Sequence, residues 1–252
     1  MTGPVMRLLA KLAGTAVALA ALAGPATAQS LNLDLGDQGG GSTSGLIVQL
    51  VALITVLSLA PSILVMVTSF TRIVVVLSFL RSALGTQQAP PNPVLISLAL
   101  FLTAFIMAPV FQQAWDNGIA PFIEDRIDGE EAFSETIRPF RQFMLTHVRE
   151  QDLGLFMEMA DIEPVAGPDE VPLQALVPAF MISELRRAFE IGFLLFLPFL
   201  IIDMVVASVL MSMGMMMLPP VMISLPFKLI FFVLVDGWYL VTGSLVQSFG
   251  GL

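Results

Sequence analysis

Two charged side chains, Asp203 and Lys228, interrupt the long apolar segments near the end of the chain. Asp203 lies eleven residues before Gly214, and Lys228 lies eight residues after Pro220. If the two segments form an antiparallel helical hairpin, these charges lie at comparable depth on opposite arms. Because isolated charges are costly in an apolar interior, we predict an intramembrane ion pair that holds the hairpin in one register. The alternative is a proton-carrying Asp203, with Asp236 as a second station.

A second group of charges lies where the preceding apolar segment begins. On a helix, Glu184 and Arg187 form an i, i+3 pair, and Arg186 and Glu190 form an i, i+4 pair. Such pairs stabilise an exposed helix by only a few tenths of a kcal/mol each. At the mouth of a membrane span, we therefore expect this polar cluster to make structural contacts or contacts between subunits, and not to catalyse a reaction.

The sequence shows no arrangement typical of an enzyme or a metal site. It has no G-x-x-x-x-G-K-[ST] phosphate loop, no H-E-x-x-H metal motif and no cysteine. The single histidine, His147, lies among polar neighbours, and we predict that it is solvated and binds no ligand. We therefore expect no catalytic residue, no metal and no cofactor. The formal net charge of −9 also argues against nucleic acid as a partner.

A methionine-rich turn, MSMGMMMLPP, joins the segments that carry Asp203 and Lys228. Gly214 allows a tight turn, and two prolines separate the helices on either side. Methionine is unbranched and polarisable, so this cluster fits either a packed turn or a soft surface that closes on itself or on varied partners. Five of the seven residues from 211 to 217 are methionines: Met211, Met213, Met215, Met216 and Met217.

The composition indicates an all-α polytopic membrane protein. Hydrophobic residues make up 56% of the 252 residues and charged residues 12%, whereas about a quarter of a soluble domain is charged. Four apolar segments fit membrane spans, since about 20 helical residues cross the hydrocarbon core. They are Leu46–Val67, Val94–Ala114, Ala188–Met213 and Val221–Tyr239.

The first 45 residues precede these spans. Residues 1–28 resemble a cleaved signal peptide, with a positive region, a short apolar region and the A-x-A sequence that ends at Ala28. An uncleaved anchor is the alternative. Residues 29–45 contain the run GGGSTSG and are predicted to form a flexible linker.

The spans define a first membrane hairpin, residues 46–115, and a second, residues 181–252. Pro61 and Arg72 interrupt the apolar run of residues 46–84, so we predict a break there, with a span over residues 63–80 as an alternative register. Arg72 is expected to mark the cytoplasmic end of the first span. Arg81 and the turn GTQQAPPNP (85–93) complete a loop that has basic residues and no acidic ones, which favours the cytoplasmic side. Trp115 is expected to close the second span.

Residues 116–180 form an acidic region that we place outside the cytoplasm. Sixteen of the twenty acidic residues lie between Asp116 and Glu190. Apolar residues recur at helical spacing from Phe133 to Val148, and again from Leu153 to Ala160 behind a possible N-cap at Asp152. We expect two amphipathic helices that pack against membrane helices or neighbouring subunits.

Three segments of the C-terminal region carry a resemblance to a known family. PAFMISELRRAFEIGF (178–193), PFLIIDMVVASVLMSMGMMMLPP (198–220) and ISLPFKLIFFVLVDGWYL (223–240) closely resemble the FliP/SctR family of type III secretion export-gate proteins. A weaker resemblance covers most of residues 46–115. The resemblance implies broken helical hairpins, and Met215, Met216 and Met217 match the methionine gasket of the family, with Met211 and Met213 as supports.

The resemblance also implies a location and partners. Several copies would form a ring with FliR and FliQ, near FlhB and FlhA, in the flagellar basal body of the bacterial inner membrane. This homo-oligomer would pass unfolded flagellar proteins, surrounded by membrane lipid, with energy supplied elsewhere. Two alternatives are the equivalent subunit of a virulence injectisome and a small-molecule or ion transporter, for which intramembrane charges would mark the site.

Overall fold

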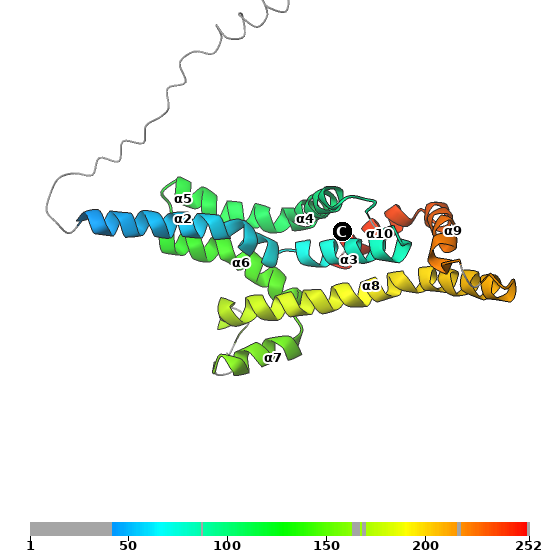
Figure 1. The fold of residues 1–252 in the computed structure, drawn as a ribbon. Helices are drawn as coiled ribbons and strands as arrows, with labels where there is room; N and C mark the ends of the chain where they lie inside the picture. Colours follow the sequence, from blue (N-terminus) through cyan, green and yellow to red (C-terminus); the bar gives the residue numbers. More distant parts are fainter. Residues whose placement is uncertain (1–41, 87, 163–166, 168–169, 216–217, 251–252) are drawn as a thin grey trace, which may run out of the picture. The chain divides into compact units, whose positions relative to one another are not determined.

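The computed structural model describes residues 42–86, 88–162, 167, 170–215 and 218–250 (Figure 1). Within these ranges the chain is helical and contains no strand, so the prediction of an all-α fold is confirmed. The predicted signal peptide, residues 1–28, lies outside the described residues, as do residues 29–41 of the predicted linker and two gasket methionines, Met216 and Met217.

The chain divides into two units, and the boundary between them lies between Thr55 and Val56. Helix α2 (Ser42–Met66) crosses this boundary. The helix starts four residues before the predicted span, inside the region assigned to a linker. The linker assignment rested on polar composition, but Ser and Thr are also well suited to the start of a helix. The helix ends one residue before the predicted end of the span at Val67.

The predicted break in the apolar run is present. The chain turns at residues 67–69 and continues as α3 (Phe70–Leu84), whose buried residues recur at helical spacing: Ile73, Val76, Leu77, Leu80 and Leu84. Gly85, in the left-handed conformation with φ 77°, ends this helix. We had expected Arg72 to mark the cytoplasmic end of the first span, and the structure contradicts this. Arg72 lies inside α3 and is only 3% exposed.

The second predicted span continues beyond its expected end at Trp115. Helix α4 (Asn92–Ala114) leads into a π-helical turn, η1 (Trp115–Ile119), and then into α5 (Ala120–Ile123). A π turn adds a residue to the helical path without ending it. The turn packs tightly on α6, because a Cβ added at Gly118 would lie 2.2 Å from Thr136 Oγ1.

The acidic region contains two helices, as expected, α6 (Gly129–His147) and α7 (Glu150–Met159). Asp128 caps α6 by accepting a hydrogen bond from the Glu131 N–H at 2.9 Å. The predicted cap of α7 at Asp152 is wrong, because the helix already begins at Glu150. The Asp152 carboxylate instead accepts a hydrogen bond of 2.6 Å from the Ser183 hydroxyl.

Helix α8 (Leu173–Ser212) is the longest described helix, with 40 residues, and contains the third predicted span in its C-terminal part. Helix α9 (Pro220–Leu234) follows the methionine-rich turn. The next helix, α10 (Gly237–Gln247), is bent by 63° relative to α9. The fourth predicted span is therefore not one straight helix. Asp236 takes a left-handed conformation at the bend, with φ 51°.

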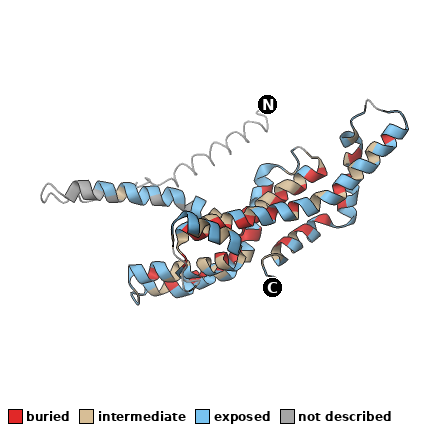
Figure 2. Cartoon of the chain, turned by 90° about the horizontal axis from the view of Figure 1, so that it is seen from below, coloured by how far each residue is buried: buried red, intermediate tan, exposed pale blue. Residues whose placement is uncertain are grey.

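Two clusters of buried side chains hold these helices together, and Figure 2 shows the buried positions as stripes along them. In the first cluster, α3 packs against α4, α8 and α9, and α10 packs against α4 and α9 (Figure 1). The second joins the end of α4 to α6 and the beginning of α8. Its members include Met107, Phe143, Met144, Leu176 and Phe180.

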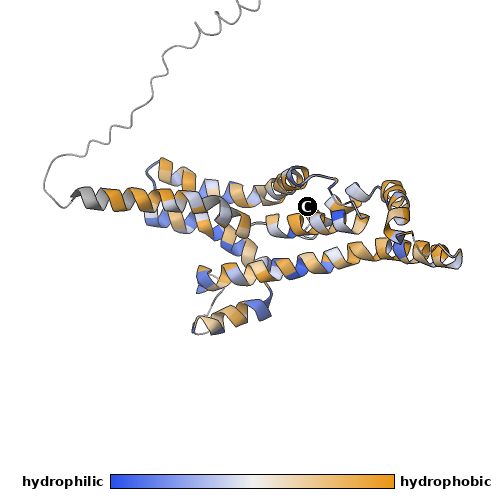
Figure 3. Cartoon of the chain, in the orientation of Figure 1, coloured by the Kyte–Doolittle hydropathy of each residue, from blue (hydrophilic) through white to orange (hydrophobic). Residues whose placement is uncertain are grey.

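Much apolar surface stays exposed in the single chain. Figure 3 shows apolar residues along most of α8 and α9, and Met204, Val233 and Leu234 are 65%, 76% and 79% exposed. Among the described residues, Asn92–Ile123 and Leu173–Ser212 are long and apolar enough to cross a membrane, and the bent pair α9 and α10 gives a third span if it is counted as one. Such surface suits a membrane protein. The sequence-based expectation of four membrane spans stays a prediction.

Candidate functional site

The structure brings Asp203 and Lys228 together across the hairpin of α8 and α9. The Lys228 ammonium lies 2.6 Å from Asp203 Oδ2. The same ammonium donates a hydrogen bond of 3.1 Å to the carbonyl oxygen of Ala83, in the last turn of α3. The Ser224 hydroxyl donates to Asp203 Oδ1 at 2.5 Å. The pair therefore joins α3, α8 and α9. The contacts with Ala83 and Ser224 were not foreseen from the sequence.

The two members of this pair are buried to different degrees. The Lys228 side chain is 4% exposed, whereas that of Asp203 is 26% exposed. Lys228 also lies at the C-terminal end of α3, where the helix dipole and the unpaired carbonyl groups favour a cation. Asp236, the proposed second proton station, is exposed at the α9–α10 bend, about two helical turns along the chain from Lys228. The structure does not place it beside Asp203.

Glu184 makes a buried ion pair that the sequence analysis did not predict. Its side chain is fully buried, and both of its carboxylate oxygens accept hydrogen bonds from the Arg72 guanidinium, one of them 2.9 Å long. The expected pair of Glu184 with Arg187 is therefore wrong. A bidentate contact inside the protein is more favourable than an exposed contact within one helix. Arg72 and Glu184 are 112 residues apart in the chain, so no local spacing indicates the contact.

Arg72 also holds the end of the described chain. It donates hydrogen bonds of 3.0 Å to both the carbonyl oxygen and the hydroxyl of Ser248. Its guanidinium carbon lies 3.7 Å from the centre of the Phe249 ring, within the range of a cation–π contact. The Arg72 and Glu184 pair thus connects α3, α8 and the residues after α10.

The other members of the polar cluster stay on the surface of α8. Arg186 forms the expected pair with Glu190, at 3.2 Å, and Arg187 approaches the second oxygen of Glu190, also at 3.2 Å. The side chains of Arg186, Arg187 and Glu190 are 57%, 59% and 46% exposed. Their contacts with other subunits remain a prediction.

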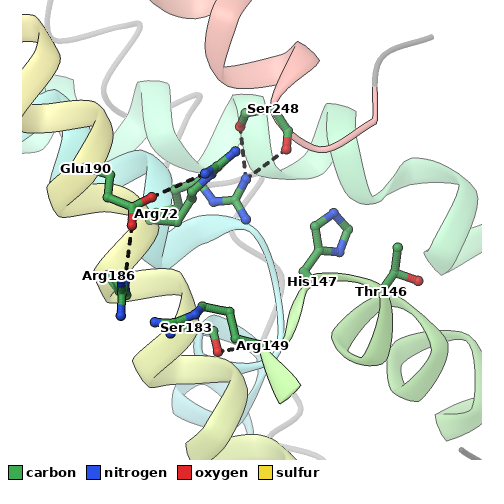
Figure 4. A pocket seen from close by; sticks show the side chains of 9 residues that line it. Arg72, Thr146, His147, Arg149, Ser183, Arg186, Glu190 and Ser248 are labelled. Atoms are coloured by element: carbon green, nitrogen blue, oxygen red, sulfur yellow. Dashed lines mark hydrogen bonds and ion pairs between the residues drawn. The ribbon is translucent and has the colours of Figure 1, made fainter. Parts of the chain in front are cut away.

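A polar cavity of about 330 Å³ lies over this cluster, lined by residues of α3, α6 and α8 and by Ser248 (Figure 4). His147 lines this cavity. We had expected a solvated side chain, but His147 is half-buried, because the centres of the Phe143 and Phe249 rings lie 4.6 and 5.2 Å from the centre of its ring. Its Nδ1 lies 2.8 Å from the carbonyl oxygen of Phe143. Within the described ranges, no group of three or more His, Asp or Glu side chains is placed to hold a metal ion.

The methionine-rich turn lies at the tip of the hairpin. Gly214, with φ 72°, ends α8 in a Schellman motif: its N–H bonds to the Met211 carbonyl, and that of Met215 bonds to the Leu210 carbonyl. Pro220 then starts α9. The described methionines of the turn are exposed: Met211 and Met213 by 61% and Met215 by 44%. They are available for contacts outside the chain.

The sequence is similar to the FliP family, whose profile matches residues 53–245. The flagellar biosynthetic protein FliP of Caulobacter vibrioides is 62% identical over 235 residues, which cover 93% of this chain and 88% of that protein. The FliP proteins of Bacillus subtilis and Rhizobium meliloti are 58% and 50% identical, over 91% and 96% of their lengths and 80% and 92% of this chain. The matched residues include both ion pairs and the methionine-rich turn.

Proposed function

Because the chain belongs to the FliP family, we propose that it is a structural subunit of the flagellar type III protein export gate. Several copies, with FliR and FliQ and next to FlhB and FlhA, form a channel in the inner membrane at the flagellar basal body. Unfolded flagellar proteins pass through it. The relatives reported above are flagellar proteins, which favours this role over that of an injectisome subunit.

The observation that carries the proposal is the set of exposed methionines at the tip of a hairpin whose arms are joined by an ion pair. The ion pair of Asp203 and Lys228 holds the two arms together at a fixed level. Met211 and Met213 are 61% exposed and Met215 is 44% exposed at the end of α8 in the single chain. Flexible apolar side chains contributed by several subunits are suited to seal a pore against water and ions, and to deform around a passing chain.

The exposed apolar faces of α8 and α9 are consistent with a subunit that needs partners. A single chain with this much apolar surface is expected to associate with lipid or with other chains. The charges inside the hairpin are satisfied by each other and by backbone, so no observation favours a substrate site of a small-molecule transporter there.

The native mass of the full chain in mild detergent tests the proposal. We expect a discrete multimer of several copies that incorporates FliR and FliQ when these are co-expressed. A stable monomer or dimer that ignores both partners would contradict the export-gate proposal. It would favour the transporter alternative, which uptake of ions or small molecules by the purified chain would then test.

Replacement of Met215, Met216 and Met217 by alanine is expected to increase ion conductance several-fold when the assembled channel is reconstituted in a bilayer. Alanine lacks the length and flexibility to meet side chains from neighbouring copies, so the seal is lost. Met222→Ala is a matched control, because Met222 is 66% exposed on α9, outside the turn. Unchanged conductance in the triple variant, with assembly intact, would refute the gasket.

A further inference from the structure

The cavity beside the exposed part of the polar cluster carries a net positive charge. Glu190 is the one acidic side chain among the described residues that line it. Two of the lining guanidinium groups are already neutralised by carboxylates outside the lining: Arg72 pairs with Glu184, and Arg149 pairs with Asp152 at 3.7 Å. Four arginines line the cavity: Arg72, Arg149, Arg186 and Arg187.

The remaining charges do not balance. Arg186 and Arg187 both share the single carboxylate of Glu190, so this group keeps one formal positive charge. Both arginines are more than half exposed and can turn towards a ligand without breaking a buried contact. The planar guanidinium group suits phosphate oxygens, which it can contact with two parallel hydrogen bonds. A phosphodiester, which carries one negative charge, would neutralise the group.

An apolar groove of about 240 Å³ follows the cavity along the same helix. It lies between α3 and α8, and its wall includes Phe79, Phe193 and Leu197. Gly192 lets the two helices approach closely there, since a Cβ at this position would lie 2.6 Å from the Phe79 ring. Phe193 is 64% exposed and Leu197 37% exposed, so the groove opens to the outside of the chain.

Some of the residues that line the cavity and some that line the groove share one face of α8. Arg186, Glu190, Phe193, Leu197 and Leu200 follow one another at spacings of four, three, four and three residues, the pattern of a single helical stripe. Charged residues occupy the first turn of the stripe and apolar residues the next turns. The stripe extends about 21 Å along the helix axis, at 1.5 Å per residue.

We propose that this stripe, together with Arg187 beside its first turn, binds one anionic phospholipid, with its phosphate between Arg186 and Arg187 and an acyl chain in the groove beside Phe193 and Leu197. A carboxylate from a second copy of the chain would match the charge but not the apolar groove. A free phosphate ion would also leave the groove empty. Helix α8 is one of the described stretches apolar and long enough to cross a membrane, which brings the stripe within reach of lipid. This inference does not depend on the export role.

Native mass spectrometry of the full chain, in its native state of assembly, tests the proposal. Purified protein is titrated with phosphatidylglycerol, with phosphatidylcholine of the same acyl chains, and with soluble glycerol phosphate. We expect retained phosphatidylglycerol and little of the other two ligands. The double variant Arg186→Gln/Arg187→Gln is expected to bind phosphatidylglycerol about thirtyfold more weakly, because two basic contacts are lost.

The matched control is Arg126→Gln/Arg138→Gln. These arginines are 62% and 61% exposed, comparable to Arg186 and Arg187, but each pairs with a glutamate of its own and lies away from the cavity. A second variant, Leu197→Trp, fills the groove and keeps the charges, so it should weaken phosphatidylglycerol binding as well. It replaces the arginine variant as the test if that variant does not fold.

Three results would overturn the proposal. They are equal retention of phosphatidylglycerol and phosphatidylcholine, binding of glycerol phosphate as strong as that of the lipid, and lipid binding unchanged in both the arginine and the tryptophan variants. Loss of the multimer in the arginine variant with lipid binding unchanged would instead assign Arg186 and Arg187 to contacts between subunits, as the sequence alone suggested.

Discussion

Glu184→Gln is expected to destabilise the folded chain by about 3–5 kcal/mol, the usual cost of leaving one partner of a buried ion pair without the other. The Arg72 guanidinium would stay buried at 3% exposure with no carboxylate beside it. That cost is a large part of the roughly 5–15 kcal/mol by which folded proteins are stable. We therefore expect a lower unfolding temperature in detergent and poor accumulation of the variant in membranes.

Glu190→Gln is the matched control for this prediction. It makes the same chemical change on the same helix, two turns further along, but Glu190 is 46% exposed and its ion pairs are on the surface. Solvent screens exposed ion pairs and they contribute little to stability, so the unfolding temperature should change little. The double variant Arg72→Met/Glu184→Met should recover part of the stability, because it removes both buried charges. Equal unfolding temperatures for Glu184→Gln and Glu190→Gln would contradict the proposed importance of the buried pair.

The Arg72 and Glu184 pair also shows what the sequence did not reveal. Arg72 was visible as a charge inside an apolar run, and we interpreted it as the end of a span because positive residues often mark the cytoplasmic side. Glu184 was assigned to its neighbour Arg187, because helical spacing identifies only partners within one helix. A contact between α3 and α8 depends on how the helices pack, and one sequence carries no direct signal for it.

Asp203 and Lys228 were placed together from the sequence for a different reason. Their segments are joined by a turn of few residues, so equal distances from the turn give equal depth on the two arms of a hairpin. The Ala83 carbonyl belongs to a third helix outside this hairpin, and its contact with Lys228 was not foreseen. Counting along the chain thus finds partners across a tight turn and misses those brought by longer connections.

Helix ends were less well predicted than helices. Trp115 suggested an end because aromatic residues gather at membrane interfaces, yet the backbone continues through a π turn to Ile123. Hydropathy also favoured one span from Val221 to Tyr239, although the chain bends by 63° between α9 and α10. The left-handed conformation of Asp236 causes this bend, and hydropathy does not report on backbone conformation.

Lys228→Asp is expected to abolish assembly of the chain into its multimer. The new carboxylate would face both Asp203 and the Ala83 carbonyl oxygen, so like charges meet in a buried site at the end of α3. Asp203→Lys should be milder, because the side chain of residue 203 is 26% exposed and a lysine there can extend its ammonium towards water. The fraction of chain recovered as multimer, measured by native mass, gives the order of the two effects.

The double exchange Asp203→Lys/Lys228→Asp should recover only part of the assembly. It restores opposite charges across the hairpin, but an aspartate at position 228 still faces the Ala83 carbonyl. The exposed pair of Glu124 and Arg126, between α5 and α6, is the control, and its single reversals should change assembly little. A double variant that assembles no better than Lys228→Asp alone would argue against direct pairing.

The two interpretations of Asp203 predict opposite results for Asp203→Asn. If Asp203 carries protons, the variant should assemble normally and lose transport. If Asp203 is a structural partner of Lys228, assembly should be impaired, because Lys228 is left buried without its carboxylate.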